Sequence, residues 1–464
     1  MSKPYSLGDR RELFVDDWLI AEMHGARLQL QRPERREVAL CMDAAWEDSV
    51  AFADRVLAWE DGWRLYYRAG ILDWDREEDT YVLALAESQD GITFTRPDLG
   101  VVECEGSRSN NMLQIGGFPN VPPPFVDTNP ACREGQRFKG LTGKEVKAYA
   151  IASADGIRWT PMQEEPLELP GQFDTVNTAF WDNVTGCYRC FTRSWHDLES
   201  GRVLSGWDFK DSQPVRAIQQ STSEDFIHWT PPDQLRYVDG DNSVHLYTNA
   251  ILPCPGAEHI YLGFPNRYVP ERKPNPDHKY EGVNDGLFMA SRDGINWTRW
   301  LDAWVRPGLD ELNWTERNNY PVWGIAETSP TEWSMYISEH YRHEGVPAIM
   351  RRLSIRPWGF VSVHADHAGG EMLTKPFTFS GNQLRLNFST SAAGSISVGL
   401  SDQQGQELPG LSSEDMEPLY GDALDAAVQW KDRTDLAELE GQPICLRFQL
   451  KDADLFALRF SGDA

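Results

Sequence analysis

A seven-residue motif occurs four times along the chain at nearly even spacing. Each copy has Ser in the first place, Asp in the third, Ile in the fifth and an aromatic residue in the seventh, at 88–94, 153–159, 223–229 and 291–297. Successive copies begin 65, 70 and 68 residues apart. A regular period of this length indicates repeated supersecondary units, and a β-rich unit of this size is typical of one propeller blade. The repeat therefore predicts an all-β propeller.

The residue types of the motif favour a tight turn. Ser and Asp side chains can accept hydrogen bonds from nearby backbone N–H groups, and the Gly that follows Asp in three copies supplies a positive φ. We expect the aromatic residue that closes each copy to pack on the neighbouring sheet. The four motifs are thus predicted to be structural, and none to be catalytic.

Five blade-sized stretches cover about 46–105, 110–168, 171–236, 243–305 and 313–364. The fifth lacks the motif but keeps the pattern of short apolar runs, and a terminal repeat often departs from the others. Beyond Gly369-Gly370, apolar and polar residues alternate as in the strands of a β-sandwich. We predict three parts: a strand segment at 1–45, a five-bladed β-propeller catalytic domain at 46–365, and a C-terminal β-sandwich at 366–464.

The charge of the chain excludes two classes of partner. The 464 residues include 71 acidic and 44 basic residues, for a net charge of −27. Such a surface repels nucleic acids and anionic membranes, so neither is an expected partner. We expect the sandwich to brace the propeller or to mediate dimerisation into a homo-oligomer.

The cysteines do not indicate a metal or a redox site. There are seven, and the single C-x-x-C pair, Cys187 and Cys190, lies in a sequence that reads as a strand, with no second pair to complete a zinc site. No phosphate-binding glycine loop or other cofactor motif is present. No cofactor is therefore expected.

The expected location is the cytoplasm. Residues 1–8 contain no signal-type segment, no apolar run reaches 18 residues, and scattered thiols suit a reducing compartment. A secreted or periplasmic location applies if a leader has been removed.

Five blades followed by a sandwich of about 95 residues resemble the five-bladed glycoside hydrolases, which include the invertase/inulinase and arabinanase/β-xylosidase families. The S-x-D-G-x-x-W copies look most like the invertase side. The W-x-N-D-P-N-G, R-D-P and E-C motifs of invertases are absent, so the chain resembles a divergent member. The resemblance implies three acids on the inner strands of blades one, two and three, at the mouth of the central channel.

Glycoside cleavage requires two carboxyl groups, one to protonate the leaving oxygen and one to act as nucleophile or base. In blade one the candidate is Asp48, with Glu47 as the alternative after a one-residue shift of register. In blade two Asp127 lies between apolar residues, where the resemblance places the acid that stabilises the transition state. In blade three Asp174 stands where the resemblance implies a Glu as general acid, and Glu339 in blade five is a reserve acid.

Other polar and aromatic residues near the predicted inner strands suit sugar hydroxyls and rings. Amides both donate and accept hydrogen bonds, and one Asn recurs at an equivalent place in four blades. Alternation puts His245 on the same face of a strand as one of them. The candidate substrate-binding residues are Trp46, Asn129, Asn177, His245, Asn249, Arg267, Arg317 and Asn318.

The predicted function is a glycoside hydrolase that releases a terminal sugar from an oligo- or polysaccharide. One alternative is a glycoside phosphorylase, in which Arg267, Arg317 and His340 would bind phosphate. A second is a non-catalytic carbohydrate-binding protein. A third is a sialidase-like enzyme, because the turn motif occurs there too, although sialidases have three arginines on a six-bladed ring and five blades are counted here.

Overall fold

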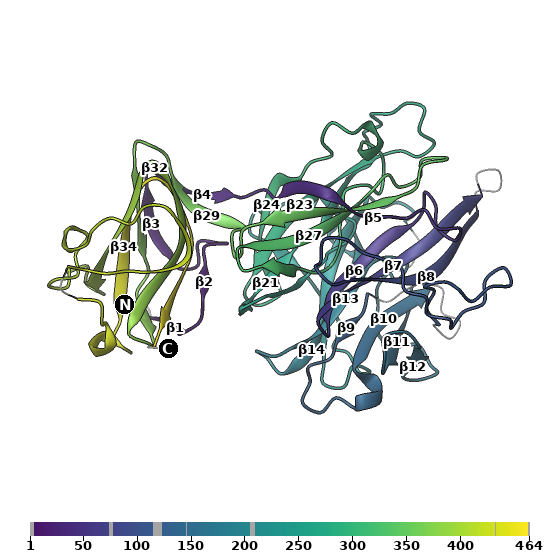
Figure 1. Cartoon of the computed structure of the whole chain (residues 1–464), viewed down its shortest axis with the longest axis horizontal. Helices are drawn as coiled ribbons and strands as arrows, with labels where there is room; N and C mark the ends of the chain where they lie inside the picture. Colours follow the sequence, from purple (N-terminus) through teal and green to yellow (C-terminus); the bar gives the residue numbers. More distant parts are fainter. Residues whose placement is uncertain are drawn as a thin grey trace. The chain divides into compact units, whose positions relative to one another are not determined.

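A computed structural model describes residues 4–73, 78–114, 123–144, 146–204, 209–431 and 433–462. These residues form strands and short 3-10 helices, with no α-helix among them, which confirms the all-β fold class (Figure 1). Contacts divide the chain into a unit of residues 33–254 and 258–355 and a unit of residues 1–32, 255–257 and 356–464. The 3-10 helices are η1 (Glu134–Gln136), η2 (Glu311–Asn313), η3 (Ser413–Asp415) and η4 (Ala437–Leu439).

The first unit contains five separate sheets, one for each predicted blade. Blade one consists of β6 (Phe52–Trp59), β7 (Gly62–Asp73) and β8 (Glu78–Ser88). Blade two consists of β9 (Phe125–Val126), β10 (Phe138–Lys144), β11 (Lys147–Ser153) and β12 (Thr160–Pro161). Blade three consists of β13 (Thr178–Asp182), β14 (Cys187–Asp197), β15 (Val203–Leu204), β16 (Pro214–Ser223) and β17 (Asp233–Gln234).

Among the described residues, blade four has seven strands and blade five has five. Blade four consists of β18 (Arg236–Tyr237), β19 (His245–Leu246), β20 (Leu252–Cys254), β21 (Ala257–Gly263), β22 (Asn266–Val269), β23 (Val283–Ser291) and β24 (Asn296–Val305). Blade five consists of β25 (Tyr320–Pro321), β26 (Ala326–Ser329), β27 (Glu332–Glu339), β28 (Ile349–Ile355) and β5 (Glu34–Cys41).

The inner strands β6, β9, β13, β20 and β25 line the middle of the propeller. Strand β13 contacts both β9 and β20, and β25 contacts β23 of blade four. A bridge between Arg55 of β6 and Trp323, just after β25, joins blade five to blade one, and Arg55 also donates to the carbonyl of Pro124 beside β9. The inner strands therefore form a closed ring, as in a propeller.

The predicted N-terminal segment 1–45 is divided between the two units. Strand β5 pairs with β28 and becomes the outermost strand of blade five, so that the two ends of the propeller sequence meet in one sheet. At the other boundary, β29 (Val361–Ala365), which the sequence pattern placed in the propeller, pairs with β4 (Ala26–Leu30) in the second unit. Both boundaries of the propeller are determined by strand pairing between segments more than 300 residues apart. A local sequence pattern contains no information on such pairing.

The repeated motifs form turns, as predicted. In the first copy, Ser88 Oγ and Asp90 Oδ1 accept hydrogen bonds from the N–H groups of residues 91, 92 and 93, and the other copies repeat this arrangement. Phe226 occupies the glycine position of the third copy with φ 69°. The closing Trp297 packs edge-on against Phe191 of blade three, so the fourth motif helps to join adjacent blades.

The second unit is one continuous ten-stranded sheet that encloses its own apolar core. Its longest strands, β32 and β34, pair along most of their lengths, with an irregularity between Thr390 and Ser395. These strands supply alternating buried residues, as predicted for the sandwich. The ten strands are β1 (Tyr5–Gly8), β2 (Glu12–Leu13), β3 (Ile20–His24), β4, β29, β30 (Gly370–Thr374), β31 (Phe377–Phe379), β32 (Gln383–Asp402), β33 (Asp422–Ala427) and β34 (Ile444–Ser461).

Candidate functional site

A small pocket of about 160 Å³ lies at the end of the ring where the inner strands begin, and we call it the mouth pocket. Its lining comes from blades one, three, four and five, and residues 115–122, which precede the inner strand of blade two, lie outside the described residues. Tyrosines and arginines dominate it. The lining residues are Val50, Phe52, Arg68, Tyr81, Asp174, Thr175, Tyr247, Arg317, Tyr320 and Tyr341.

Asp174 is the predicted acid that lines the mouth pocket. It lies four residues before β13, and 36% of its side chain is exposed. Its carboxylate accepts a hydrogen bond from the guanidinium of Arg193, a buried residue of β14. The ion pair orients the carboxylate, and the exposed part of the side chain remains open to a ligand.

Blade one distinguishes Asp48 from Glu47. The Glu47 side chain is buried, and it accepts hydrogen bonds from Tyr67 (2.5 Å) and Arg96 (2.5 Å), which assigns it a structural role. Asp48 is half-buried, and its carboxylate has no hydrogen bond or ion pair with any described residue. The next residue, Ser49, accepts a hydrogen bond from the N–H of Arg342, so this turn lies beside Tyr341 at the mouth pocket.

Asp127 has a different environment from the one predicted. It directly follows β9, and it is not among the residues that line the mouth pocket, where the resemblance implied it. Its fully buried carboxylate accepts hydrogen bonds from Lys139 Nζ (2.5 Å) and the Tyr188 hydroxyl (2.7 Å). A buried lysine and carboxylate held in this way indicate a structural ion pair inside the sheet of blade two.

Glu339, the reserve acid, is also held by partners. Its buried carboxylate accepts hydrogen bonds from Arg351 Nε (2.6 Å) and Asn313 Nδ2 (3.0 Å), and Arg35 Nε lies 3.3 Å away. A buried carboxylate held by two guanidiniums and an amide indicates a structural role for Glu339.

The recurring asparagines hold the main chain. Asn177 accepts a hydrogen bond from the N–H of Arg193, and Asn318 from the N–H of Tyr341, while Asn249 donates to the carbonyl of Phe191. Asn129 donates to the hydroxyl of Tyr188. Asn177, Asn249 and Asn318 connect the segments before the inner strands to neighbouring strands, and Asn129, which follows β9, connects blade two to Tyr188 of blade three. These contacts explain the recurrence of the amides without a sugar.

His245 and Trp46 lie near the ring but do not line the mouth pocket. His245 Nδ1 is 3.4 Å from Arg216 Nη1, and burial together with that guanidinium lowers the pKa of His245 to about 4. Trp46 donates from its indole nitrogen to Asn111 and faces a separate hollow at blade one.

Two acids beside the mouth pocket were not predicted. Asp54 is 2% exposed and occupies a bulge of β6, where burial raises its pKa to about 6 despite its ion pair with Arg68 (3.3 Å). Glu316 is buried, and its oxygens lie 3.0 Å from Arg317 Nε and 3.0 Å from Arg342 Nη1. An Asp inside the apolar run of β6 is the sequence signal that could have identified the first of them.

The backbone next to the mouth pocket is unusual. Arg317, Asn319, His340 and Arg342 all have φ between 57° and 64°, in the left-handed region that non-glycine residues rarely occupy. These residues lie in two segments that are joined by the hydrogen bonds of Asn318. Backbone strain of this kind is concentrated at functional sites.

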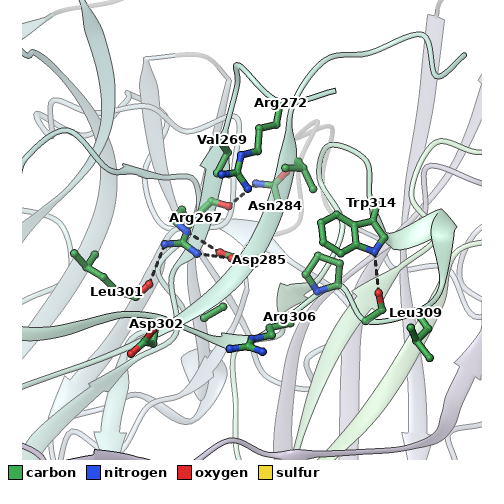
Figure 2. Close-up of a pocket in the computed structure, with 14 residues that line it drawn as sticks. Arg267, Val269, Arg272, Asn284, Asp285, Leu301, Asp302, Arg306, Leu309 and Trp314 are labelled. Carbon is green, nitrogen blue, oxygen red and sulfur yellow. Dashed lines mark hydrogen bonds and ion pairs between the residues drawn. The ribbon is translucent and has the colours of Figure 1, made fainter. Parts of the chain in front are cut away.

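A larger pocket of about 730 Å³ lies on blade four and the loop before η2, and we call it the outer groove (Figure 2). Arg267, a predicted substrate-binding residue, lies here and forms an ion pair with Asp285 (2.8 and 2.5 Å). Trp314 is 37% exposed, and its indole nitrogen donates to the carbonyl of Gly308. Asn284 connects the two pockets, because it lines the outer groove and accepts a hydrogen bond from the N–H of Arg317 (2.6 Å).

Among the described residues, no group of three or more His, Cys, Asp or Glu side chains is placed to hold a metal ion. The same residues contain no helix with the length and apolar character needed to span a membrane.

No protein-family model and no curated protein matches the chain. Among solved structures, it is similar to BT0996 in its complex with RGII (TM-score 0.44, 13% identity, 72% of this protein and 95% of that one covered). It is also similar to a glycosyl hydrolase from Bacteroides ovatus (TM-score 0.42, 14% identity, 74% of this protein and 96% of that one covered). A third similar structure is the β-1,2-mannobiose phosphorylase of Listeria innocua (TM-score 0.40, 12% identity, 70% of this protein and 97% of that one covered). Glycoside hydrolases and a glycoside phosphorylase are thus among the solved structures similar to this chain. Because these TM-scores lie below 0.5, our proposal for the function rests on the contacts of this chain.

Proposed function

We propose that the protein is a glycoside hydrolase that removes one terminal sugar from an oligo- or polysaccharide in the mouth pocket. The observation that carries the proposal is the exposed carboxylate of Asp174 in a pocket lined by tyrosines from three blades. Aromatic side chains with a few polar groups are typical of sites for small ligands. A volume of about 160 Å³ is small beside the roughly 300–1,000 Å³ of drug-sized sites, which favours one terminal unit.

In this mechanism Asp174 acts as the nucleophile or base, and Arg193 orients it. Asp48 supplies the second carboxyl group, because Glu47, Asp127 and Glu339 are already held by cations whereas the Asp48 carboxylate has no partner among the described residues. The bond between the anomeric carbon and the leaving oxygen breaks, and the acid protonates that oxygen. Water then bonds to the anomeric carbon through its oxygen and gives one proton to the carboxylate that acts as base, which leaves the hydroxyl group of the released sugar.

The test is sugar release from a panel of aryl glycosides and plant and algal oligosaccharides, with and without phosphate. We expect Asp174→Asn and Asp48→Asn each to reduce kcat/KM by about 10²- to 10⁴-fold. A matched control is Asp422→Asn, because Asp422 is an exposed Asp paired with Arg356 in the other unit.

Each other outcome changes the proposal in a defined way. Release that requires phosphate would replace hydrolysis by phosphorolysis. Binding without release from any substrate would indicate a carbohydrate-binding protein. Full activity in both pocket variants would remove the reaction from the mouth pocket.

A further inference from the structure

Arginines outnumber carboxylates around the mouth pocket. Three of the four carboxylates there already have a cation: Asp54 pairs with Arg68, Asp174 with Arg193, and Glu316 with both Arg317 and Arg342, while Asp48 has no partner among the described residues. A fifth arginine, Arg216 of β16, forms no ion pair with a carboxylate of any described residue. The chain as a whole has a net charge of −27, so this local positive excess runs against its composition.

Arg216 is enclosed by aromatic rings. Its guanidinium carbon lies 4.4 Å from the ring centre of Trp195, 4.8 Å from Tyr247 and 5.0 Å from Tyr268. Its Nε is buried without a hydrogen-bond partner among the described residues, and burial lowers the pKa of Arg216. Its polar neighbour His245, whose pKa is about 4, is neutral at pH 7 and supplies no counter-charge.

Three guanidiniums converge on Tyr247, which lines the mouth pocket. Besides Arg216, the guanidinium carbon of Arg193 lies 5.3 Å from the Tyr247 ring centre, and that of Arg317 lies 5.8 Å away. Burial alone would raise the pKa of the Tyr247 hydroxyl, but the three cations together lower it below its ordinary value. Arg193 Nε is also buried without a hydrogen-bond partner among the described residues.

An enclosed cation without a counter-charge is unfavourable unless a ligand supplies one. A guanidinium matches the geometry of carboxylate and phosphate oxygens, with which it forms paired hydrogen bonds. Cation–π contacts hold Arg216 in place without using its N–H groups, and the Nε atoms of Arg216 and Arg193 have no hydrogen-bond partner among the described residues.

We propose that Arg216, with Arg193 and Arg317, forms an oxyanion-binding site around Tyr247, beside the mouth pocket that Tyr247 and Arg317 line. The oxyanion is the carboxylate of an acidic sugar or inorganic phosphate acting as a second substrate. The identity of the sugar rests on the proposed function, whereas the binding of the anion does not.

The test measures binding without turnover. Isothermal titration calorimetry measures the binding of inorganic phosphate and of D-glucuronate, with D-glucose as the neutral control ligand. The proteins are the wild type, Arg216→Gln, Arg216→Lys and Arg236→Gln. Arg236 is the matched control, because its side chain is exposed on blade four and has no partner among the described residues. We expect one anion to bind the wild type and the control within twofold of each other, and Arg216→Gln to lose at least about tenfold in affinity. Arg216→Lys should lie between them, because it keeps the charge and loses the paired donors.

A thermal readout separates a binding role from a structural one. Without ligand, Arg216→Gln should unfold at the wild-type temperature or above it, because an unpaired cation has been removed. Added anion should raise the Tm of the wild type and leave that of Arg216→Gln unchanged.

The two sources of the oxyanion give different results. Binding of glucuronate alone assigns an acidic sugar, and binding of phosphate alone assigns a phosphate co-substrate. Binding of neither anion, or equal binding by Arg216→Gln, would overturn the proposal. Anion binding without sugar release from any substrate would support this site while the proposed hydrolase activity fails.

Discussion

The mouth pocket and the outer groove both contain arginines, but they use them in different ways. In the mouth pocket, about 160 Å³ in volume, the guanidiniums lie against tyrosine rings and paired carboxylates. In the outer groove, about 730 Å³ in volume, Arg272 and Arg306 are exposed and have no ion pair with any described residue (Figure 2). An exposed cation in water has little energetic consequence, whereas an enclosed one must be compensated.

This difference indicates a division of roles. Enclosed charges in a small volume select a chemical group and fix its position, which a reaction requires. Exposed charges with one aromatic side chain can bind a longer ligand with less selectivity. Asn284 joins the two regions, so we expect the terminal unit of a substrate in the mouth pocket and the rest of it in the outer groove.

The largest contrast should come from removing one arginine of an Arg–Asp pair in each region. Arg193→Met leaves Asp174 without the guanidinium that orients it, and we expect kcat/KM on a small aryl glycoside to fall by about 10³-fold. Arg267→Met breaks the ion pair with Asp285 in the outer groove. We expect its fold loss of kcat/KM on the same substrate to be at least about tenfold smaller than the loss in Arg193→Met. Steady-state kinetics on both variants measures the contrast, and equal losses would contradict the division of roles.

The sequence predicted the architecture well, because the repeat and the turn chemistry are local. Five blades, the structural role of the motifs and a separate C-terminal sheet all follow from short-range patterns. The closing strand β5 was not predicted, because its pairing with β28 depends on a contact between distant segments. No propensity or period within residues 34–41 indicates which sheet they join.

The candidate site was predicted only in part. The segments before the inner strands contain Asp174, Arg317 and the turn with Asp48, and all three lie at or beside the mouth pocket. Arg68, Arg193 and Arg216 were not predicted, because they come from second and third strands. In those strands alternation fixes opposite faces, but it does not show which face turns toward the channel.

Asp54 gives a second contrast, in the pH dependence of stability. Burial raises its pKa to about 6 from an ordinary value of 3.8, so the folded state holds the proton more tightly between these values. The free energy of unfolding should therefore fall by about 3 kcal/mol as the pH rises from about 4 to about 6. Asp54→Asn removes this contribution. The free energy of unfolding of Asp54→Asn minus that of the wild type should therefore be about 3 kcal/mol larger at pH 7 than at pH 4. Urea denaturation at both pH values measures the change.

The matched control for Asp54 is Asp285→Asn in the outer groove. Burial also raises the pKa of Asp285, but 16% of its side chain is exposed and Arg267 opposes the shift. We expect a pH effect of the same sign and a smaller size. A difference between Asp54→Asn and the wild type that does not change with pH would show that Asp54 titrates alike in the folded and unfolded states.

The smallest expected effect tests the outer groove itself. Trp314 presents a partly exposed ring whose orientation is fixed by its hydrogen bond to Gly308 (2.8 Å). If the ring stacks on a sugar beyond the terminal unit, Trp314→Ala should raise KM for a long oligosaccharide by about tenfold, which corresponds to about 1.4 kcal/mol. Its KM for an aryl glycoside should stay within twofold of the wild type, because that substrate ends before the groove. Trp314→Phe keeps an aromatic ring and should recover most of the loss. An equal rise of KM for both substrates would show that Trp314 stabilises the nearby Arg317 segment and does not bind sugar. That result would contradict the division of roles between the mouth pocket and the outer groove.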